Sequence, residues 1–164
     1  MITQTYEAVE LGGGNSPRVR PNIDIFKALN VDIVADLSKG IPLPEGCTKK
    51  IYSYDFIEHL TFLDFLALLR ECRRILIQGG VIEFETPDMD KILVTHNEYN
   101  NHVHHCVVGE WDEKRPELRH KSWWTPSLIT YVLRHEGWTD IEVSEFRNDA
   151  DYWKEPKMVI KAEK

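Results

Sequence analysis

Acidic residues follow three short apolar runs in the first part of the chain, and a glycine-rich turn lies at the first of them. The turn runs from Glu10 to Asn15 and contains three consecutive glycines, while Asp24 and Asp36 follow the next two runs. Glycines let a ligand approach main-chain N–H groups closely, and a carboxylate accepts hydrogen bonds from hydroxyl and amino groups. These residues predict a pocket for a polar ligand at the ends of three strands.

The spacing of these residues discriminates between ligands. The dinucleotide fingerprint needs G-x-G-x-x-G at the start of a helix and an acid about 20 residues further on. Here Pro17 takes the place of the third glycine, and Asp24 lies only 14 residues after Glu10. A nicotinamide dinucleotide is therefore disfavoured, and a ligand with an amino-acid end, a ribose and an adenine but no phosphate fits better. Each feature alone also has an ordinary reading, since glycine triplets are common in loops and aspartates are common helix caps.

A second set of reactive side chains lies in a polar segment over residues 88–121. The histidines and the cysteine in or near its centre are His96, His102, His104, His105, Cys106 and His120. A long insertion is often functional, and a histidine can take a proton from a hydroxyl or an amine near neutral pH. Histidine and cysteine also bind zinc, but the segment lacks a second paired motif with zinc-finger spacing. We therefore expect a substrate lid and no metal.

Alternating apolar segments and breakers predict the elements that position these groups. Strands are expected over residues 6–11, 22–26, 32–35, 50–54 and 81–85, with closing strands near 140–146 and 157–162. Helical spacing predicts one helix from Thr61 to the pair Gly79-Gly80 and another from Thr125 to Gly137. Strands that alternate with helices form parallel sheets, and the short last loop makes the closing strands antiparallel. The predicted fold is α/β, with a Rossmann-like, mostly parallel sheet and an antiparallel C-terminal strand.

Length and composition limit the class of protein. The 164 residues suffice for one core, so residues 1–164 are expected to form a single domain. The net charge of -7 disfavours nucleic-acid binding, and the basic cluster of Arg70, Arg73 and Arg74 is interpreted as a solvated helix face. No apolar run reaches the length of a membrane span, and the N-terminus lacks a signal-peptide pattern. Three widely spaced cysteines do not suggest a disulfide framework, and a cytoplasmic location is expected.

Several runs of residues, taken in order, carry a family resemblance. They are VELGGGNSP (9–17), NIDI (22–25), ADLSKGIPLP (35–44), DFIEHL (55–60), RRILIQGG (73–80) and TPD (86–88). Together they resemble the class I S-adenosylmethionine-dependent methyltransferases, specifically the short bacterial and phage-type proteins of the methyltransferase type 11 group. The resemblance covers almost the whole chain. Because only about ten residues separate Leu11 from Asn22, we expect the first crossover helix to be reduced to a turn. Because the sequence starts at its first predicted strand, we also expect a fold that is minimal at its N-terminus and lacks the N-terminal helices that cover the cofactor in larger relatives.

The resemblance implies S-adenosylmethionine as the cofactor and assigns its contacts to residues at the strand ends. These residues are Glu10, Leu11, Gly12, Gly14, Asn15, Asp24, Ile25, Asp36, Leu37, Tyr54 and Asp55. By this likeness the glycine turn wraps the methionine portion and Glu10 orients it. Asp24 accepts hydrogen bonds from the ribose, and Asp36 accepts one from the adenine amino group, with Leu37 against the ring. Tyr54 and Asp55 are expected beside the sulfonium.

The implied reaction is methyl transfer to an unknown oxygen or nitrogen nucleophile on a small-molecule or glycan acceptor. The candidate bases are Asp55, His59, Asp88, His105 and His120. For Glu58 and His59 a capping or surface role is favoured over a catalytic one. A non-catalytic cofactor-binding or scaffold module, and an enzyme for another adenosine ligand, are the alternatives. The missing N-terminal cover also leaves room for a homo-oligomer in which a second subunit completes the site.

Overall fold

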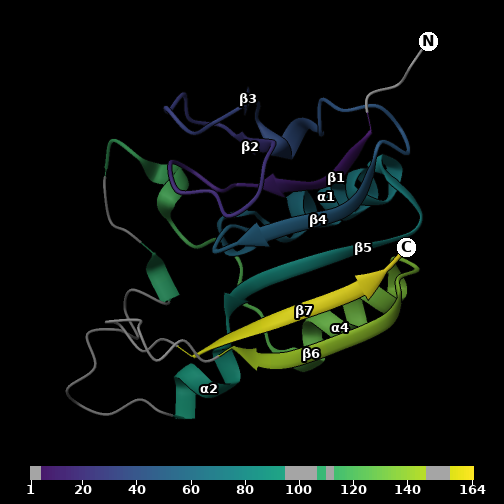
Figure 1. Ribbon diagram of the computed structural model, residues 1–164. Coiled ribbons are helices and arrows are strands. Elements are labelled where there is room, and N and C mark those ends of the chain that lie inside the picture. The colour runs from purple at the N-terminus through teal and green to yellow at the C-terminus, as the bar shows by residue number, and fades with distance from the viewer. Residues whose placement is uncertain (1–4, 95–106, 110–112, 147–155) are drawn as a thin grey trace.

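The computed structural model describes residues 5–94, 107–109, 113–146 and 156–164, and Figure 1 shows their arrangement around one sheet. The seven strands are β1 (Tyr6–Leu11), β2 (Asn22–Asp24), β3 (Ile33–Val34), β4 (Thr48–Tyr54), β5 (Leu76–Pro87), β6 (Thr139–Phe146) and β7 (Lys157–Glu163). Their order in the sheet is β3-β2-β1-β4-β5-β7-β6. Strands β1 to β5 pair in parallel, and β7 runs antiparallel to both β5 and β6. The predicted fold class is confirmed.

Two helices, α1 (Phe62–Ile75) and α4 (Pro126–His135), cover one face of this sheet, behind the strands in Figure 1. A short helix α2 (Met89–Val94) follows β5, and 3-10 helices span Leu37–Lys39, Ile57–His59 and Pro116–Leu118. The covering helices α1 and α4 begin at Thr61 and Thr125, as predicted, because each threonine hydroxyl accepts a hydrogen bond from a backbone N–H of the first turn. In the parts of the chain that the structure describes, every helix is too short or too polar to cross a membrane.

The core lies between the sheet and these helices. Val9 and Leu11 of β1, Ile51 of β4, and Phe65 and Leu69 of α1 are all fully buried and belong to one hydrophobic cluster. Alternate residues of each strand supply this face, as the two-residue period of a strand requires. The core therefore fixes which side of each strand is left for other contacts.

The opposite face of the sheet is covered by a loop in place of a helix. Tyr52 and Tyr54 of β4 stack with ring centroids 6.0 Å apart, and the guanidinium of Arg18 lies 3.9 Å over the Tyr54 ring. The same guanidinium donates to Glu85 of β5 at 3.0 Å. Cation–π attraction and an ion pair with a buried carboxylate therefore tie the loop after β1 to the middle of the sheet.

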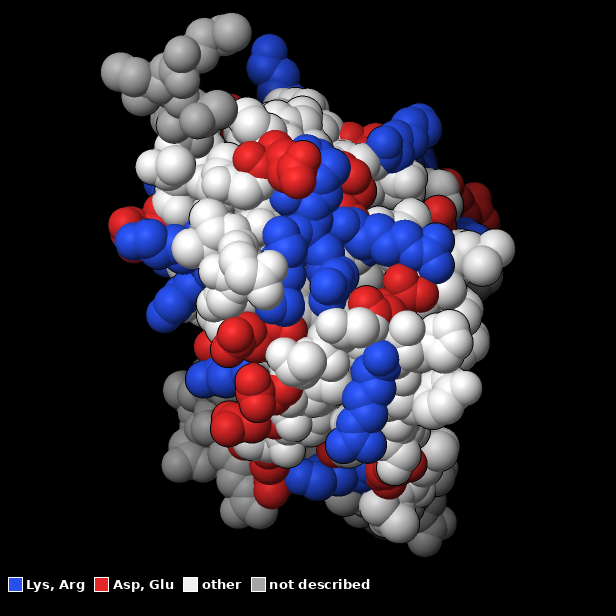
Figure 2. Space-filling view, turned by 90° about the vertical axis from the view of Figure 1, so that its right-hand side faces the viewer, with Lys and Arg blue, Asp and Glu red and all other residues white. Residues whose placement is uncertain are grey.

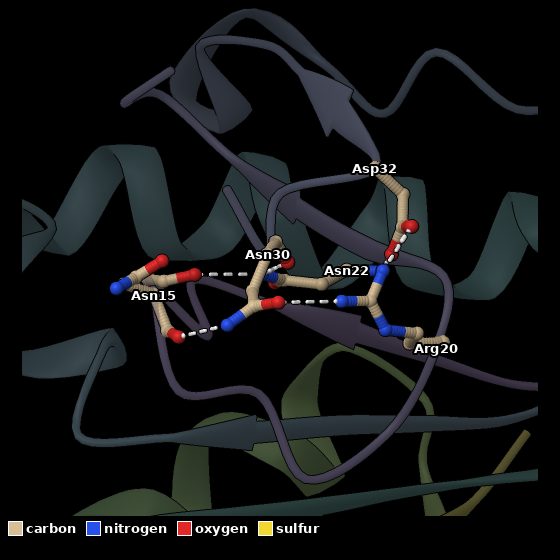
Figure 3. A network of polar contacts seen from close by, with 6 residues as sticks. Asn15, Arg20, Asn22, Asn30 and Asp32 are labelled. Carbon is tan, nitrogen blue, oxygen red and sulfur yellow. Dashed lines mark hydrogen bonds and ion pairs between the residues drawn. The ribbon is translucent and has the colours of Figure 1, made fainter. Parts of the chain in front are cut away.

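The crossovers between β1, β2 and β3 contain no helix, which confirms the expectation for the first of them. A network of polar contacts takes the helices' place, and its residues are Asn15, Arg20, Asn22, Asn30 and Asp32 (Figure 3). The fully buried Asn22 side chain accepts from Gly13 N at 3.1 Å and donates to Gly14 O at 2.9 Å and Asn30 O at 3.0 Å. These bonds satisfy loop groups that helices would otherwise pair internally.

The outer part of the network joins the two loops at the surface. The backbone N–H of Asn22 donates to Asp32 at 2.8 Å, and Arg20 pairs with the other oxygen of the same carboxylate. Arg20 also donates to the Asn30 side chain at 3.0 Å, and Asn30 in turn donates to Asn15 O at 2.8 Å. Two consecutive short crossovers are thus held as one unit.

Two expected element boundaries are wrong. The helix that starts at Thr61 ends at Ile75, and the next strand begins at Leu76 instead of residue 81. Leu76 is fully buried and pairs with Thr48 of β4, whereas the next pair along β4 joins Lys50 to Val81. The glycine pair therefore lies in a register shift inside β5 and does not cap a helix. In addition, α2 follows Asp88 directly, where no regular element was expected.

The arginines of α1 are only partly a solvated face. Figure 2, which views the side where the parallel strands begin, shows Lys and Arg gathered near the centre with Asp and Glu around them. Arg70 is exposed and pairs with Glu136, whereas Arg74 is half-buried between Glu71 and the backbone carbonyls of Ile41 and Leu43. Arg74 therefore fastens the loop before β4 to α1.

We expect Asn22→Asp to lower the free energy of unfolding by about 3 kcal/mol, because the new carboxylate cannot donate to the carbonyls of Gly14 and Asn30 and leaves them unsatisfied in the interior. Urea denaturation of both proteins measures the difference. Asn30→Asp is the matched control: it makes the same chemical change at a more accessible position beside Arg20, so it should cost far less. Equal losses in the two variants would contradict the central position given to Asn22.

Candidate functional site

A cavity of about 380 Å³ opens at the carboxyl ends of the parallel strands β1 to β4. Its walls come from Gly12, Gly14, Asp24, Ile25, Phe26, Ala35, Asp36, Leu37, Ser38, Asp55, Phe56, His59, Leu60, Asp64, Arg115, Glu117, Leu118 and Lys121. Ligands of open α/β sheets bind at this edge, outside the strand ends. The volume lies within the ordinary range of sites for small molecules and cofactors.

The glycine turn forms one wall of the cavity, and all three of its amides donate within the protein. Gly12 N donates to Ile23 O at 2.8 Å, Gly13 N donates to the Asn22 side chain at 3.1 Å, and Gly14 N donates to Asp24 at 2.9 Å. The turn therefore supplies close approach and not a set of free N–H donors, which differs from what the glycines by themselves suggested.

Two of the glycines are required by what stands next to them. Gly12 has φ +73°, and a Cβ there would lie 2.2 Å from the Phe56 ring. At Gly13 a Cβ would lie 2.5 Å from the carboxylate of Glu10 and 2.8 Å from the side chain of Asn22. Gly13 and Asn22 were not among the predicted site residues. Their importance depends on contacts between β1 and β2 that the spacing along the chain does not reveal.

Glu10 holds the turn from behind instead of facing the cavity. It is buried, and one of its carboxylate oxygens accepts from the backbone N–H groups of Arg18 and Val19 at 2.7 and 2.6 Å. Burial raises the pKa of this carboxyl, and the hydrogen bonds from Val19 and Arg18 oppose that change. The structure gives Glu10 the task of shaping the loop, while its predicted contact with a cofactor stays a prediction.

Asp24 faces the cavity with hydrogen-bonding capacity left over. One of its oxygens accepts from Phe26 N and the other from Gly14 N, both at 2.9 Å. Because an ionised carboxylate has about four acceptor positions, two more hydrogen bonds can be accepted from a ligand. The group is thus oriented by the loop and open on one side.

Asp36 combines the two roles that the sequence left open for it. It caps the 3-10 helix Leu37–Lys39 by accepting from Ser38 N at 3.1 Å, and it also lines the cavity. The Ser38 hydroxyl, and after it Lys39, lower the pKa of this carboxyl, so Asp36 is ionised near neutral pH. Leu37 lies beside it as an apolar wall.

The predicted cofactor contacts separate into two groups in space. The cavity brings together Gly12, Gly14, Asp24, Ile25, Asp36, Leu37 and Asp55. The residues outside its lining are Glu10, Leu11, Asn15 and Tyr54. Leu11 is fully buried in the core, and Tyr54 points to the face of the sheet under Arg18, where burial raises its pKa to about 12. Successive side chains of a strand point to opposite faces of the sheet, which explains why residues adjacent in the sequence fall into different groups here.

The five candidate bases are also divided. Asp55, with φ +50°, and His59 line the cavity, and Asp55 forms an ion pair with Lys157 at 2.7 Å. Asp88 is buried and caps α2 by accepting from Asp90 N at 3.1 Å, away from the lining. His120 lies behind His59, and His105 falls outside the described residues. Geometry therefore favours Asp55 and His59 as groups that touch a ligand.

Glu58, His59 and His120 gather behind the cavity wall. Their possible ligand atoms all lie within 4.8 Å of one another, and the two histidine rings are 4.9 Å apart. Glu58 is buried and accepts from the Thr86 hydroxyl at 2.9 Å, so the expected surface role for it is wrong. Burial, and then the charge of Asp55, raise the pKa of Glu58 to about 8, whereas burial and then His120 lower that of His59 to about 4.

The described end of the polar segment closes the cavity on the side away from the sheet. Arg115, Glu117, Leu118 and Lys121 line it, and the Arg115 guanidinium lies 5.0 Å from the centroid of the Phe26 ring. This contact joins the segment to the loop after β2. The substrate lid over residues 88–121 stays a prediction, because residues 95–106 and 110–112 lie outside the described parts of the chain.

Comparison with known proteins identifies the fold. Neither a protein-family model nor a curated protein matches the sequence. A SAM-dependent methyltransferase from Archaeoglobus fulgidus superposes with a TM-score of 0.67 at 16% identity, covering 98% of this chain and 86% of that one. One from Mesorhizobium loti gives 0.63 at 17% identity, covering 99% and 92%.

A third solved structure carries ligands. It is the 1,6-didemethyltoxoflavin-N1-methyltransferase of Burkholderia thailandensis with 1,6-didemethyltoxoflavin and S-adenosylhomocysteine bound, which gives a TM-score of 0.67 at 11% identity and covers 98% of this chain and 72% of that one. At identities this low, the superpositions show the fold alone. Together with the strand order, the three superpositions show that the chain has the class I S-adenosylmethionine-dependent methyltransferase fold. Membership of the type 11 group stays a prediction.

We expect Gly12→Ala to destabilise the protein more than Gly46→Ala. Both positions have positive φ, so both variants carry similar backbone strain, but only the new methyl group at residue 12 meets a neighbour, the Phe56 ring. Thermal unfolding of the two variants measures the difference. If the midpoints fall equally, the close approach of Phe56 is not what requires a glycine at residue 12.

Proposed function

We propose that this protein binds S-adenosylmethionine in the cavity at the strand ends and transfers its methyl group to an oxygen or nitrogen nucleophile. The observation that carries the proposal is the pairing of two cavity acids with a glycine turn whose amides are already used. Asp24 and Asp36 offer acceptors for a ribose diol and an adenine amino group. The fold is one in which such a cofactor binds at this edge, and relatives in fold have been crystallised with it or with its product.

The backbone amides of the glycine turn already donate within the protein, which argues against a phosphate-bearing ligand. Dinucleotide sites place a pyrophosphate against free N–H groups at the start of a helix. In this chain the amides of Gly12, Gly13 and Gly14 donate to Ile23, Asn22 and Asp24, and a loop stands where that helix would begin. An adenosine ligand without phosphates fits this wall better.

The residues around the cavity have separable tasks in this proposal. Asp24, with Ile25 beside it, binds the ribose, and Asp36 with Leu37 binds the adenine. The glycine turn leaves room for the methionine portion near Asp55. When bound, S-adenosylmethionine supplies a methyl group on a sulfonium that is already activated, so holding the acceptor in line accounts for most of the rate. His59, kept neutral by its surroundings, and Asp55 are the residues of the wall that can take the acceptor's proton.

For the acceptor we propose a small molecule or a glycan. The wall formed by Arg115, Glu117 and Lys121 is charged and would contact a polar acceptor. A cytoplasmic location belongs to the same proposal. A binding module without turnover would share the cofactor contacts, so the two functions differ in product formation and not in affinity.

Isothermal titration with S-adenosylhomocysteine tests the cofactor site. We expect Asp24→Asn to weaken binding at least about tenfold, because the amide offers fewer acceptors to the ribose. Its N–H₂ group would also stand against one of the two backbone N–H groups, of Gly14 and Phe26, that donate to Asp24. Asp32→Asn is the matched control, since Asp32 also accepts a backbone N–H of the same loops but lies outside the cavity lining. It should leave the affinity nearly unchanged.

The other outcomes are informative as well. Tighter binding of NAD than of S-adenosylhomocysteine, or equal binding by the wild type and Asp24→Asn, would contradict the proposed ligand and its place. Binding without release of S-adenosylhomocysteine, when S-adenosylmethionine is supplied with a panel of hydroxyl and amine acceptors, would favour the non-catalytic module.

A further inference from the structure

Glu58, His59 and His120 bring one carboxylate and two imidazoles together from segments far apart in the sequence. Glu58 and His59 belong to the 3-10 helix Ile57–His59 after β4, whereas His120 precedes α4. Their ligand atoms lie within 4.8 Å of one another. Neutral imidazole and carboxylate are the ligands that zinc and related ions take in sites with three protein ligands.

The backbone fixes the approach of the two segments. Lys121 N and Ser122 N both donate to Glu58 O, at 2.7 and 3.1 Å, and the Ser122 hydroxyl donates to Ile57 O at 3.3 Å. On the other side, His120 N donates to Val108 O at 3.0 Å. The residue that precedes Lys121 is therefore held against Glu58 by main-chain bonds that do not depend on the three side chains.

Two of the three groups are oriented by further hydrogen bonds. The Thr86 hydroxyl donates to one oxygen of Glu58 at 2.9 Å, and His59 Nδ1 lies 3.3 Å from Arg119 O. That contact with a carbonyl places the proton on Nδ1 and leaves the lone pair on Nε2. Metal-binding histidines and carboxylates usually have such outer contacts, in which a backbone carbonyl orients the histidine and a hydrogen-bond donor orients the carboxylate.

We propose that Glu58, His59 and His120 bind a divalent first-row transition-metal ion, of which Zn²⁺ and Co²⁺ are the representative cases. Bonds of about 2.1 Å in a tetrahedral site bring ligand atoms to about 3.4 Å from one another, so binding would draw together ligand atoms that now lie within 4.8 Å by at most about 1.4 Å. This site replaces the expectation of no metal, which considered only the spacing of histidines within residues 88–121.

The position of the ion gives it a use that rests on the proposed methyl transfer. His59 lines the cofactor cavity, whereas Glu58 and His120 lie behind it next to Trp124 and Ser122. An ion with three protein ligands would keep a position for an exchangeable ligand, and His59 would hold the ion next to the cavity. With the ion on Nε2 and the proton on Nδ1, His59 would not accept a proton from the acceptor, so Asp55 would be the base on the cavity wall.

Titration of chelator-treated protein with Co²⁺, followed by its visible absorption, and calorimetry with Zn²⁺ test the site. We expect one ion per chain bound at this site, with weak binding of Mg²⁺ because magnesium prefers all-oxygen ligands. Glu58→Gln and His120→Ala should each lower the affinity at least about 100-fold, since the loss of a direct ligand costs at least as much as the loss of an outer contact. His135→Ala, which removes an exposed histidine of α4, is the matched control and should bind like the wild type.

The same samples separate this proposal from the function on which it rests. Circular dichroism in metal-free buffer shows whether each variant is folded, and Glu58→Gln keeps the shape of the side chain in case His120→Ala does not fold. Absence of Co²⁺ and Zn²⁺ binding, or unchanged affinity in Glu58→Gln and His120→Ala, would overturn the metal site even if S-adenosylhomocysteine still binds. Ion binding that is lost only when His104, His105 and Cys106 are replaced would also overturn it. Loss of S-adenosylhomocysteine binding with metal binding intact would reject the methyltransferase proposal instead.

Discussion

Parallel strands have to be connected by a chain that returns to the start of the sheet, and its backbone polar groups must be paired on the way. Helices normally do this pairing internally, but the crossovers between β1, β2 and β3 are too short for a helix. The buried side chain of Asn22 takes over, because its one oxygen and two N–H bonds meet three loop groups from both crossovers. Glu10, Asp24 and Asp32 do the same for neighbouring amides. Much of the first half of the fold therefore depends on side chains that form the hydrogen bonds to the crossover backbone which a helix would otherwise form internally.

That exchange also shapes the cavity. Asp24 holds the glycine turn through Gly14 N and its own loop through Phe26 N, and Asp36 caps the short helix after β3. Each acid is therefore both a structural acceptor and a wall of the cavity. Pre-oriented carboxylates bind a ligand with little further loss of side-chain freedom, which suits recognition of ribose and adenine. The alternatives of helix cap and binding residue, which the sequence leaves open for these acids, are not exclusive in the folded chain.

The second half of the chain contributes the opposite wall and the buried polar cluster. Residues 113–124 run from the lid side of the cavity to the core, where Trp124 packs against Phe65 with ring centroids 4.5 Å apart. Main-chain bonds to Glu58 fix the middle of this path. Anchoring by a buried aromatic residue at one end and by backbone bonds in the middle brings His120 to His59. It also makes the wall of the cavity continuous with the core.

The sequence by itself determined the approximate positions of the strands, the two threonine-capped helices and the acids at the strand ends. All of these depend on local periodicity, capping and turn chemistry. It could also show that the first crossover has no room for a helix, since that is a matter of chain length. It could not place the end of α1 at Ile75, because the burial of Leu76 against β4 outweighs the glycine pair that follows. Nor could it show that Glu10 and Tyr54 point away from the cavity while Asp24 and Asp55 line it. Only the tertiary structure decided that the amides of the glycine turn are already used and that Glu58 and His59 meet His120, because both facts depend on contacts between segments that the sequence keeps apart.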